Sequence, residues 1–273
     1  MKRISAYKKL KEAVEKDYHI CVGLDTDKSK IPIHLLSMEN PVLEFNKIVI
    51  QNTFEYAAAY KINFAFYESE GIKGIETMIE TLKLIPDSIL VIADAKRGDI
   101  GNTSKKYAQS IYDRFKFDSV TLHPYMGYDS VSPFLEYKDK LNFILGLTSN
   151  PSSDNFEKLN LSNGRFLYQE VIAKVNEWNK SNNCGIVFGA TNSDELKLNM
   201  NNLKKLPLLL PGVGAQGGNL ESIISLFRNV DYHEYLINIS RGLLYIDSSP
   251  NFGAQIKSKL IEYNSLIKSI LNS

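Results

Sequence analysis

The chain has 273 residues, close to the length of about 250 that is typical of one (β/α)8 barrel. Hydrophobic residues make up 44% of it, which is enough for a large core, and the formal net charge is +1. So small a charge excludes an overall field that would attract nucleic acid or an anionic membrane, so any anion must be bound by a local site.

The two cysteines and the N-terminal segment indicate in which cellular compartment the protein functions. Cys21 and Cys184 each lie in a short apolar run, which is typical of buried free thiols rather than of a disulfide framework or a cysteine zinc site. Residues 1–18 are charged throughout and lack the apolar core of a secretory signal. No stretch reaches the ~20 apolar residues of a membrane span. We therefore expect a cytoplasmic protein.

Short apolar runs recur along the chain, each too brief for a helix of usual length. They are His19–Asp25, Ala58–Asn63, Ile89–Asp94, Asp118–His123, Asn142–Leu147, Cys184–Gly189, Pro207–Pro211 and Tyr235–Ser240. Such near-continuous apolar runs are typical of parallel strands that are covered on both faces.

Longer stretches between these runs carry apolar residues three and four positions apart, which predicts amphipathic helices. They are Val42–Tyr56, Gly71–Ile85, Thr103–Phe115, Arg165–Asn179, Leu220–Phe227 and the final stretch Ala254–Leu271. Alternating strands and helices favour a parallel sheet, and eight such units close a barrel. We therefore predict an α/β fold, a single (β/α)8 TIM barrel in one domain over residues 1–273. A doubly wound open sheet is the alternative, because a count of strands does not show closure.

Two connections, Thr26–Pro41 and Thr148–Gly164, are longer than the others and rich in turn-forming residues. Both follow a strand, on the side where barrel sites form, so either can cover a ligand.

Polar residues stand at or just after the C-terminal ends of most predicted strands, and in a barrel these ends meet at one mouth. They are Asp25, Lys61, Asn63, Asp94, Lys96, His123, Thr148, Ser149 and Arg241. So many polar residues at the same end predict a site there. His123, which precedes a proline, is interpreted as structural first and as a site residue second.

The densest cluster, at the end of the third predicted strand, holds Asp94, Lys96 and Asp99. Asp94 and Lys96 are two positions apart on an extended chain, so their side chains are expected to point the same way. Gly98 permits a sharp exit from the strand, and Thr103 is predicted to begin the next helix as its N-cap. The alternative is an ordinary solvated strand end with salt bridges.

A lysine between carboxylates has a definite chemistry, because negative neighbours favour its ammonium form. An ammonium ion donates a proton, whereas a Schiff-base lysine needs apolar surroundings that lower its pKa. Lys96 is therefore predicted to be a proton donor to a carbanion.

A glycine-rich segment, Pro211–Asn219, follows the seventh predicted strand, and Arg241 follows the eighth. Glycines before a helix let backbone N–H groups approach an anion, and an arginine can bind a phosphate through two hydrogen bonds. Barrel enzymes frequently bind phosphate in the loops after strands seven and eight. The combination favours a phosphate site over a plain turn.

The segment DAKRGDIGNT, Asp94–Thr103, resembles the Asp-x-Lys-x-x-Asp signature of the orotidine 5′-phosphate decarboxylase suprafamily. The shorter signature is also similar to that of keto-gulonate-phosphate decarboxylases and hexulose-phosphate synthases. Further segments, in order along nearly the whole chain, look like the long, bacterial-type branch of the orotidine-phosphate enzymes. They are Cys21–Asp25, Tyr60–Glu68, Leu147–Ser153, Pro211–Gly218 and Ile239–Tyr245.

The resemblance implies a cytoplasmic carboxy-lyase that converts orotidine 5′-monophosphate to UMP and CO2, the last step of UMP biosynthesis, with no cofactor and no metal. Two alternatives stay open. One is a magnesium-dependent sugar-phosphate decarboxylase or aldolase of the same suprafamily. The other is a non-catalytic barrel that only binds nucleotides.

The resemblance also implies roles for the charged residues. Lys96 corresponds to the proton donor to C6, and Asp94 to the carboxylate beside the substrate's own carboxylate. Lys61 corresponds to the lysine that bridges Asp94 and the ribose hydroxyls, and Asp25 to a ribose-binding aspartate.

The remaining implied roles concern a second subunit, the base and the phosphate. Asp99, with Ile100 and Thr103, corresponds to the part that reaches into the neighbouring subunit's site, which implies a homodimer. Ser149 is expected to read the pyrimidine, with the adjacent Thr148 as the alternative. The phosphate contacts are implied for Pro211, Gly212, Gln216 and Arg241.

Overall fold

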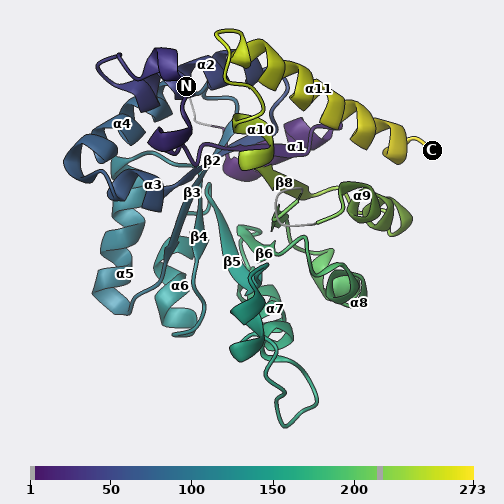
Figure 1. Ribbon diagram of the computed structural model, residues 1–273. Coiled ribbons are helices and arrows are strands. Elements are labelled where there is room, and N and C mark those ends of the chain that lie inside the picture. The colour runs from purple at the N-terminus through teal and green to yellow at the C-terminus, as the bar shows by residue number, and fades with distance from the viewer. Residues whose placement is uncertain (1–3, 214–217) are drawn as a thin grey trace.

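In the computed structural model, which describes residues 4–213 and 218–273, parallel strands form a closed barrel surrounded by helices (Figure 1). The strands are β1 (Ile20–Gly23), β2 (Ala59–Asn63), β3 (Leu90–Arg97), β4 (Ser119–Leu122), β5 (Leu141–Leu147), β6 (Cys184–Phe188), β7 (Leu208–Pro211) and β8 (Tyr235–Ile239). Each strand pairs in parallel with the next, and β1 pairs with β8. The predicted (β/α)8 barrel is confirmed, and the open-sheet alternative is wrong.

Most helices of the described residues lie around the outside of the strands (Figure 1). They are α1 (Ala6–Val14), α2 (Pro41–Thr53), α3 (Phe64–Glu68), α4 (Gly71–Leu84), α5 (Gly101–Ala108), α6 (Tyr128–Leu135), α7 (Leu167–Trp178), α8 (Ser193–Leu203), α9 (Leu220–Asn229), α10 (Arg241–Leu244) and α11 (Phe252–Leu271). None of these helices is long and apolar enough to cross a membrane.

Every predicted helix is present, but the predicted start of α5 is wrong. The helix begins at Gly101, Ile100 takes the N-cap position without a side-chain cap, and Thr103 lies inside the first turn. Gly101 has a φ of +49°, a left-handed value that glycine adopts without strain, and the N-cap lies three residues before the predicted one. At its other end α5 continues as a π-helical turn, Gln109–Arg114.

The apolar core has an outer and an inner part. The outer part lies between the strands and the helices and contains most of the buried aromatic rings. The inner part fills the barrel with side chains such as Ala59, Ile92, Phe143, Leu209 and Leu236. Because side chains alternate along a strand, the inner face of β2 and β3 continues from these apolar residues to charged ones nearer the C-terminal end.

Helix α1 closes the N-terminal end of the barrel. Its Lys9 Nζ lies 2.7 Å from Asp118 Oδ2, just before β4, and 3.3 Å from the carbonyl oxygen of Ile89, just before β3. The side chains of Lys9 and Asp118 are 1% and 3% exposed. The neighbouring Leu10 packs on the inner apolar cluster. Helix α1 therefore covers the N-terminal end of the barrel.

The two cysteines are buried and free, as predicted. Burial raises the pKa of both thiols to about 12, so neither is a thiolate at neutral pH.

Candidate active site

A cavity of about 470 Å³ lies at the C-terminal end of the barrel. Each strand, or the segment directly after it, contributes to the wall, as is usual for a barrel site. The wall includes the predicted residues Asp25, Lys61, Asp94, Lys96, Ser149, Pro211, Gly212 and Arg241. The fold thus brings together residues from widely separated parts of the sequence.

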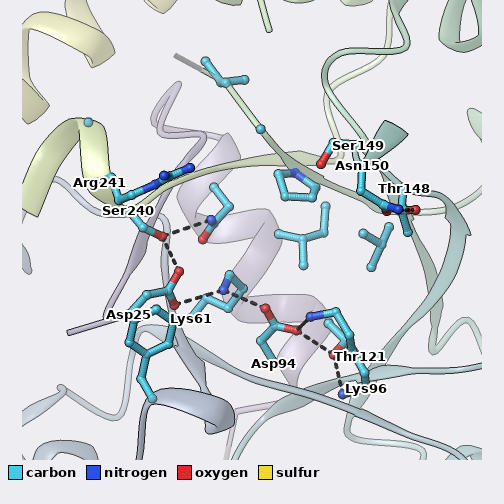
Figure 2. Close-up of a pocket in the computed structure, with 18 of the residues that line it drawn as sticks. Asp25, Lys61, Asp94, Lys96, Thr121, Thr148, Ser149, Asn150, Ser240 and Arg241 are labelled. Atoms are coloured by element: carbon cyan, nitrogen blue, oxygen red, sulfur yellow. Dashed lines mark hydrogen bonds and ion pairs between the residues drawn. The ribbon is translucent and has the colours of Figure 1, made fainter. Parts of the chain in front are cut away.

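Charged side chains of alternating sign form a row in this cavity (Figure 2). Lys61 Nζ lies 3.3 Å from Asp25 Oδ1 and 2.9 Å from Asp94 Oδ2. Lys96 Nζ lies 2.6 Å from Asp94 Oδ1. Asp94 therefore has a cation at each oxygen, and Lys61 lies between two carboxylates. We call Asp25, Lys61, Asp94 and Lys96 the charged row.

Burial decides how the members of the row affect one another. The side chains of Lys61 and Asp94 are 3% and 10% exposed, whereas that of Lys96 is 50% exposed. Burial alone would raise the pKa of Asp94, but Lys61 and Lys96 outweigh it and hold that pKa well below its usual range. Burial alone would lower the pKa of Lys61, but Asp25 and Asp94 outweigh it and raise that pKa. At neutral pH the row therefore contains a buried carboxylate and a buried ammonium ion.

Lys96 reaches Asp94 from a backbone that is not extended. Its φ is +45°, and the pairing of β3 with β4 shifts register between Ala93 and Arg97. The expectation of an extended chain at Lys96 is therefore wrong, although the expected meeting of the two side chains is observed. A bulge that adds residues to one strand re-aims its side chains, which is why the simple alternation fails here.

Asp25 is held from the last strand as well as by Lys61. Ser240 Oγ donates a hydrogen bond of 2.7 Å to Asp25 Oδ2 (Figure 2). Gly23 makes room for this contact, because a Cβ at residue 23 would lie 2.0 Å from Ser240 Oγ. Nearby, Asn238 lines the cavity, and its buried Oδ1 has no hydrogen-bond partner within the described part of the chain. Such an orphaned acceptor is costly unless a ligand donates to it.

Thr148 and Ser149 both line the cavity, but the Thr148 hydroxyl is used inside the protein. Thr148 Oγ1 lies 2.7 Å from Asn150 Oδ1 and 2.8 Å from Glu157 Oε1. The backbone N–H of Thr148 donates to Glu157 Oε2 at 2.6 Å. Glu157 thus fixes the strand end after β5, next to Ser149 in the cavity wall.

The predicted phosphate residues occupy the ends of the last two strands. Pro211 ends β7, and Gly212 has a φ of +99°, a left-handed value that favours glycine. Arg241 begins α10 directly after Ser240, and the two are neighbours in Figure 2. Gln216 lies outside the described residues.

The chain is similar to proteins of one known family along most of its length. Residues 18–247 match the family model described as Orotidine 5′-phosphate decarboxylase / HUMPS family. An orotidine 5′-phosphate decarboxylase of Dehalococcoides mccartyi strain CBDB1 is 46% identical over 248 residues, covering 89% of this chain and 90% of that protein. One of Porphyromonas gingivalis is 44% identical over 240 residues, with 86% of each chain covered.

The chain belongs to the orotidine 5′-phosphate decarboxylase / HUMPS family. The solved structure of Leishmania donovani OMP decarboxylase superposes with a TM-score of 0.81 at 34% identity and covers 97% of this chain and 99% of that one. The resemblance stated from the motifs is therefore confirmed, and the matched relatives are decarboxylases.

Three residues of the family's signature segment do not line the cavity. Asp99 Oδ1 accepts the N–H of Ile100 at 2.8 Å, Ile100 is 59% exposed, and Thr103 is exposed on the first turn of α5. The chain thus presents all three on the surface beside β3. His123 is also absent from the wall, and its backbone N–H pairs with the Arg97 carbonyl oxygen at 2.8 Å, which fits the structural interpretation.

Several wall residues were missed by the sequence reasoning. They are Asp27, Lys30, Thr121, Asn150, Asn238, Ser240 and Tyr245. Thr121 and Ser240 stand at strand ends, so the rule that found Asp94 could have found them. Asp27 and Lys30 belong to the long connection after β1, and Asn150 to the one after β5, so both long connections contribute to the wall.

Proposed function

We propose that this protein is a decarboxylase of orotidine 5′-monophosphate, producing UMP and CO2 in the last step of UMP biosynthesis. The observation that carries the proposal is the charged row, set in the same cavity as Arg241 and Gly212. The names of the curated relatives support the same reaction. The proposal includes a single catalytic domain, a cytoplasmic location and catalysis without a cofactor or metal.

The proposed chemistry centres on Lys96. Breaking the bond between C6 and the carboxylate leaves an electron pair on C6, and no conjugated electron sink is available in the pyrimidine. An ammonium ion placed beside that carbon stabilises the charge as it develops. Lys96 Nζ then transfers a proton to C6, which completes UMP.

Asp94 has a second, smaller role in this proposal. Because its pKa is held well below the usual range, its carboxylate is negative when the substrate's carboxylate arrives. Repulsion between the two groups favours departure of CO2. Lys61 keeps Asp94 in place and is proposed, with Asp25, to bind the ribose hydroxyls.

The rest of the substrate would supply binding energy away from the reacting carbon. Arg241, with Pro211, Gly212 and Gln216, is proposed to bind the phosphate. Ser149, which lines the same cavity, is proposed to read the pyrimidine.

We also propose a homodimer in which Asp99 completes the site of the neighbouring subunit, together with Ile100 and Thr103. The exposure of Ile100 and the absence of all three from their own cavity support this arrangement. Mixing Lys96→Ala with Asp99→Ala tests it, because mixed dimers would regain one complete site and therefore activity that neither variant has alone.

The direct test of the proposed reaction measures CO2 released from carboxyl-labelled orotidine 5′-monophosphate, with and without a strong chelator. We expect full release in both conditions. Loss of release with the chelator would support the magnesium-dependent alternative. UMP binding without CO2 release would support the non-catalytic alternative. No group of three or more metal-ligating side chains occurs among the described residues, so nothing on the structural side favours the magnesium reading.

A further inference from the structure

The pairing of β3 with β4 is interrupted beside the charged row. Ala93 pairs with Val120, and the next pair is Arg97 with Leu122. Residues 94–96 of β3 therefore face only Thr121 of β4. Extra residues in one strand lose their ladder hydrogen bonds, so the interruption needs another partner for its backbone groups.

Thr121 supplies that partner with its side chain. Its hydroxyl oxygen accepts the backbone N–H of Lys96 at 3.0 Å. The same hydroxyl donates to Asp94 Oδ1 at 3.0 Å, the oxygen that Lys96 Nζ also contacts at 2.6 Å. Thr121 is 2% exposed, so water does not compete freely for these bonds. Figure 2 shows the hydroxyl between Asp94 and the backbone of Lys96.

The conformation of Lys96 makes this bond important. A φ of +45° is left-handed, and that region is strained for a residue with a Cβ. A strained residue keeps such a conformation only when its surroundings hold it. Within the described residues the Thr121 hydroxyl holds the lysine at its backbone, while Asp94, which the same hydroxyl orients, holds it at Nζ.

We propose that Thr121 is a positioning residue: its hydroxyl fixes the Lys96 backbone and the Asp94 carboxylate together, so that the ammonium group stands where the carbanion forms. This inference rests on the proposed decarboxylation. It assigns Thr121 no contact with the reacting atoms. Its effect should appear in kcat rather than in substrate binding, because phosphate, ribose and base are bound by other residues.

The test compares Thr121→Val, which keeps the shape but removes the hydroxyl, with Thr121→Ser, which keeps the hydroxyl. We expect Thr121→Val to lower kcat by about tenfold to a hundredfold with KM changed less than about threefold, since small misplacements of reacting groups cost rate of that order. Thr121→Ser should stay within about threefold of wild type in kcat. Thr121→Ala is the second variant that removes the hydroxyl, should the valine form not fold.

Thr53→Val is the matched control. Thr53 is fully buried, also hydrogen-bonds through its hydroxyl, to the Val49 carbonyl oxygen at 2.6 Å, and does not line the cavity. It should keep wild-type kcat, even if its thermal midpoint falls. Equal kcat in Thr121→Val and wild type, or equal losses in the serine and valine variants, would overturn the inference.

A crystal structure of Thr121→Val separates this inference from the proposed reaction, because it needs no activity. We expect Lys96 to leave its left-handed φ or its Nζ to lose contact with Asp94. An unchanged Lys96 would overturn the positioning role even if the wild type releases CO2. A wild type that releases no CO2 would instead contradict the proposed reaction, whatever Lys96 does in the variant.

Discussion

Lys96 is the residue on which the proposed decarboxylation depends. Its ammonium group touches the buried Asp94, yet half of its side chain is exposed to the cavity. We predict that Lys96→Ala folds but lowers kcat by a factor of about 10³ or more, because both charge stabilisation and proton donation are lost. Steady-state CO2 release measures this. Lys83→Ala, on the exposed face of α4, is the control and should behave as wild type. A Lys96→Ala enzyme with wild-type turnover would refute the proton-donor role.

Arg241 allows the phosphate assignment to be tested with two substrates. Arg241→Ala should lower kcat/KM for orotidine 5′-monophosphate by about a hundredfold, corresponding to the loss of a charge-assisted contact of ~2–3 kcal/mol. The same change should barely affect orotidine, which has no phosphate. Similar losses with both substrates would contradict the assignment.

Gly23 leaves room for the Ser240 hydroxyl, which donates a hydrogen bond to Asp25 of the charged row. In Gly23→Ala the new Cβ would lie 2.0 Å from Ser240 Oγ, so Ser240 must rotate away from Asp25. We expect KM to rise, because Asp25 is proposed to bind the ribose. The variant Ser240→Ala removes the same hydrogen bond without the clash. It should reproduce the KM effect, and a Ser240→Ala enzyme with unchanged KM would argue against Asp25 being held this way.

At the scale of elements, α1 is the part whose contribution to stability is most easily measured. Lys9→Met removes the ammonium group that lies 2.7 Å from the buried Asp118 carboxylate, and breaking a buried ion pair typically costs about 3–5 kcal/mol. Denaturant titration should show this loss in the free energy of unfolding, whereas Lys8→Met, at a side chain 65% exposed, should change it by less than about 0.5 kcal/mol. Equal stability of the two variants would mean that the ion pair does not anchor α1.

The sequence predicted the elements whose pattern is strong. All the strands were found because buried parallel strands are continuously apolar, and α2, α4, α7, α9 and α11 were found because their apolar spacing is regular. Helices α1 and α10 were also not predicted, and three further missed helices give weak signals. Helix α3 has only five residues, α6 contains Pro133, and α8 is largely polar around Leu196, Met200 and Leu203.

The candidate site was predictable where chemistry follows a strand end, and less so where it depends on contacts across the barrel. Asp94 and Lys96 were found together because they are neighbours in the chain. Thr121 and Ser240 donate hydrogen bonds to Asp94 and Asp25, which lie 27 and 215 positions away in the chain. No local sequence pattern predicts a hydrogen bond over such a separation. The left-handed backbone of Lys96 was missed for the same reason, since a bulge is defined by the partner strand.

At the scale of the whole molecule, His19 gives unfolding a definite pH dependence. Its ring is 1% exposed and stacks on Tyr235, and burial lowers its pKa from 6.5 to about 4. Between pH 6.5 and about 4, His19 is protonated in the unfolded chain but stays neutral in the folded chain. Stability from this group is therefore complete above pH 6.5 and is lost as the pH falls to about 4, a difference of about 3 kcal/mol.

His19→Phe keeps the stacking but cannot titrate. Denaturant titrations at pH 7 and pH 4.5 should show that the variant loses less stability than wild type over this interval. Parallel losses in the two proteins would mean that His19 does not remain neutral when folded.

The strand ends and the charged row meet in the cavity, where Lys96 is proposed to face the pyrimidine. A crystal structure of the complex with UMP tests this most directly. We predict that Lys96 Nζ lies within about 3.5 Å of C6, with the phosphate against Arg241. A complex in which Lys96 points away from the pyrimidine, or in which the base lies at another part of the cavity, would contradict the account.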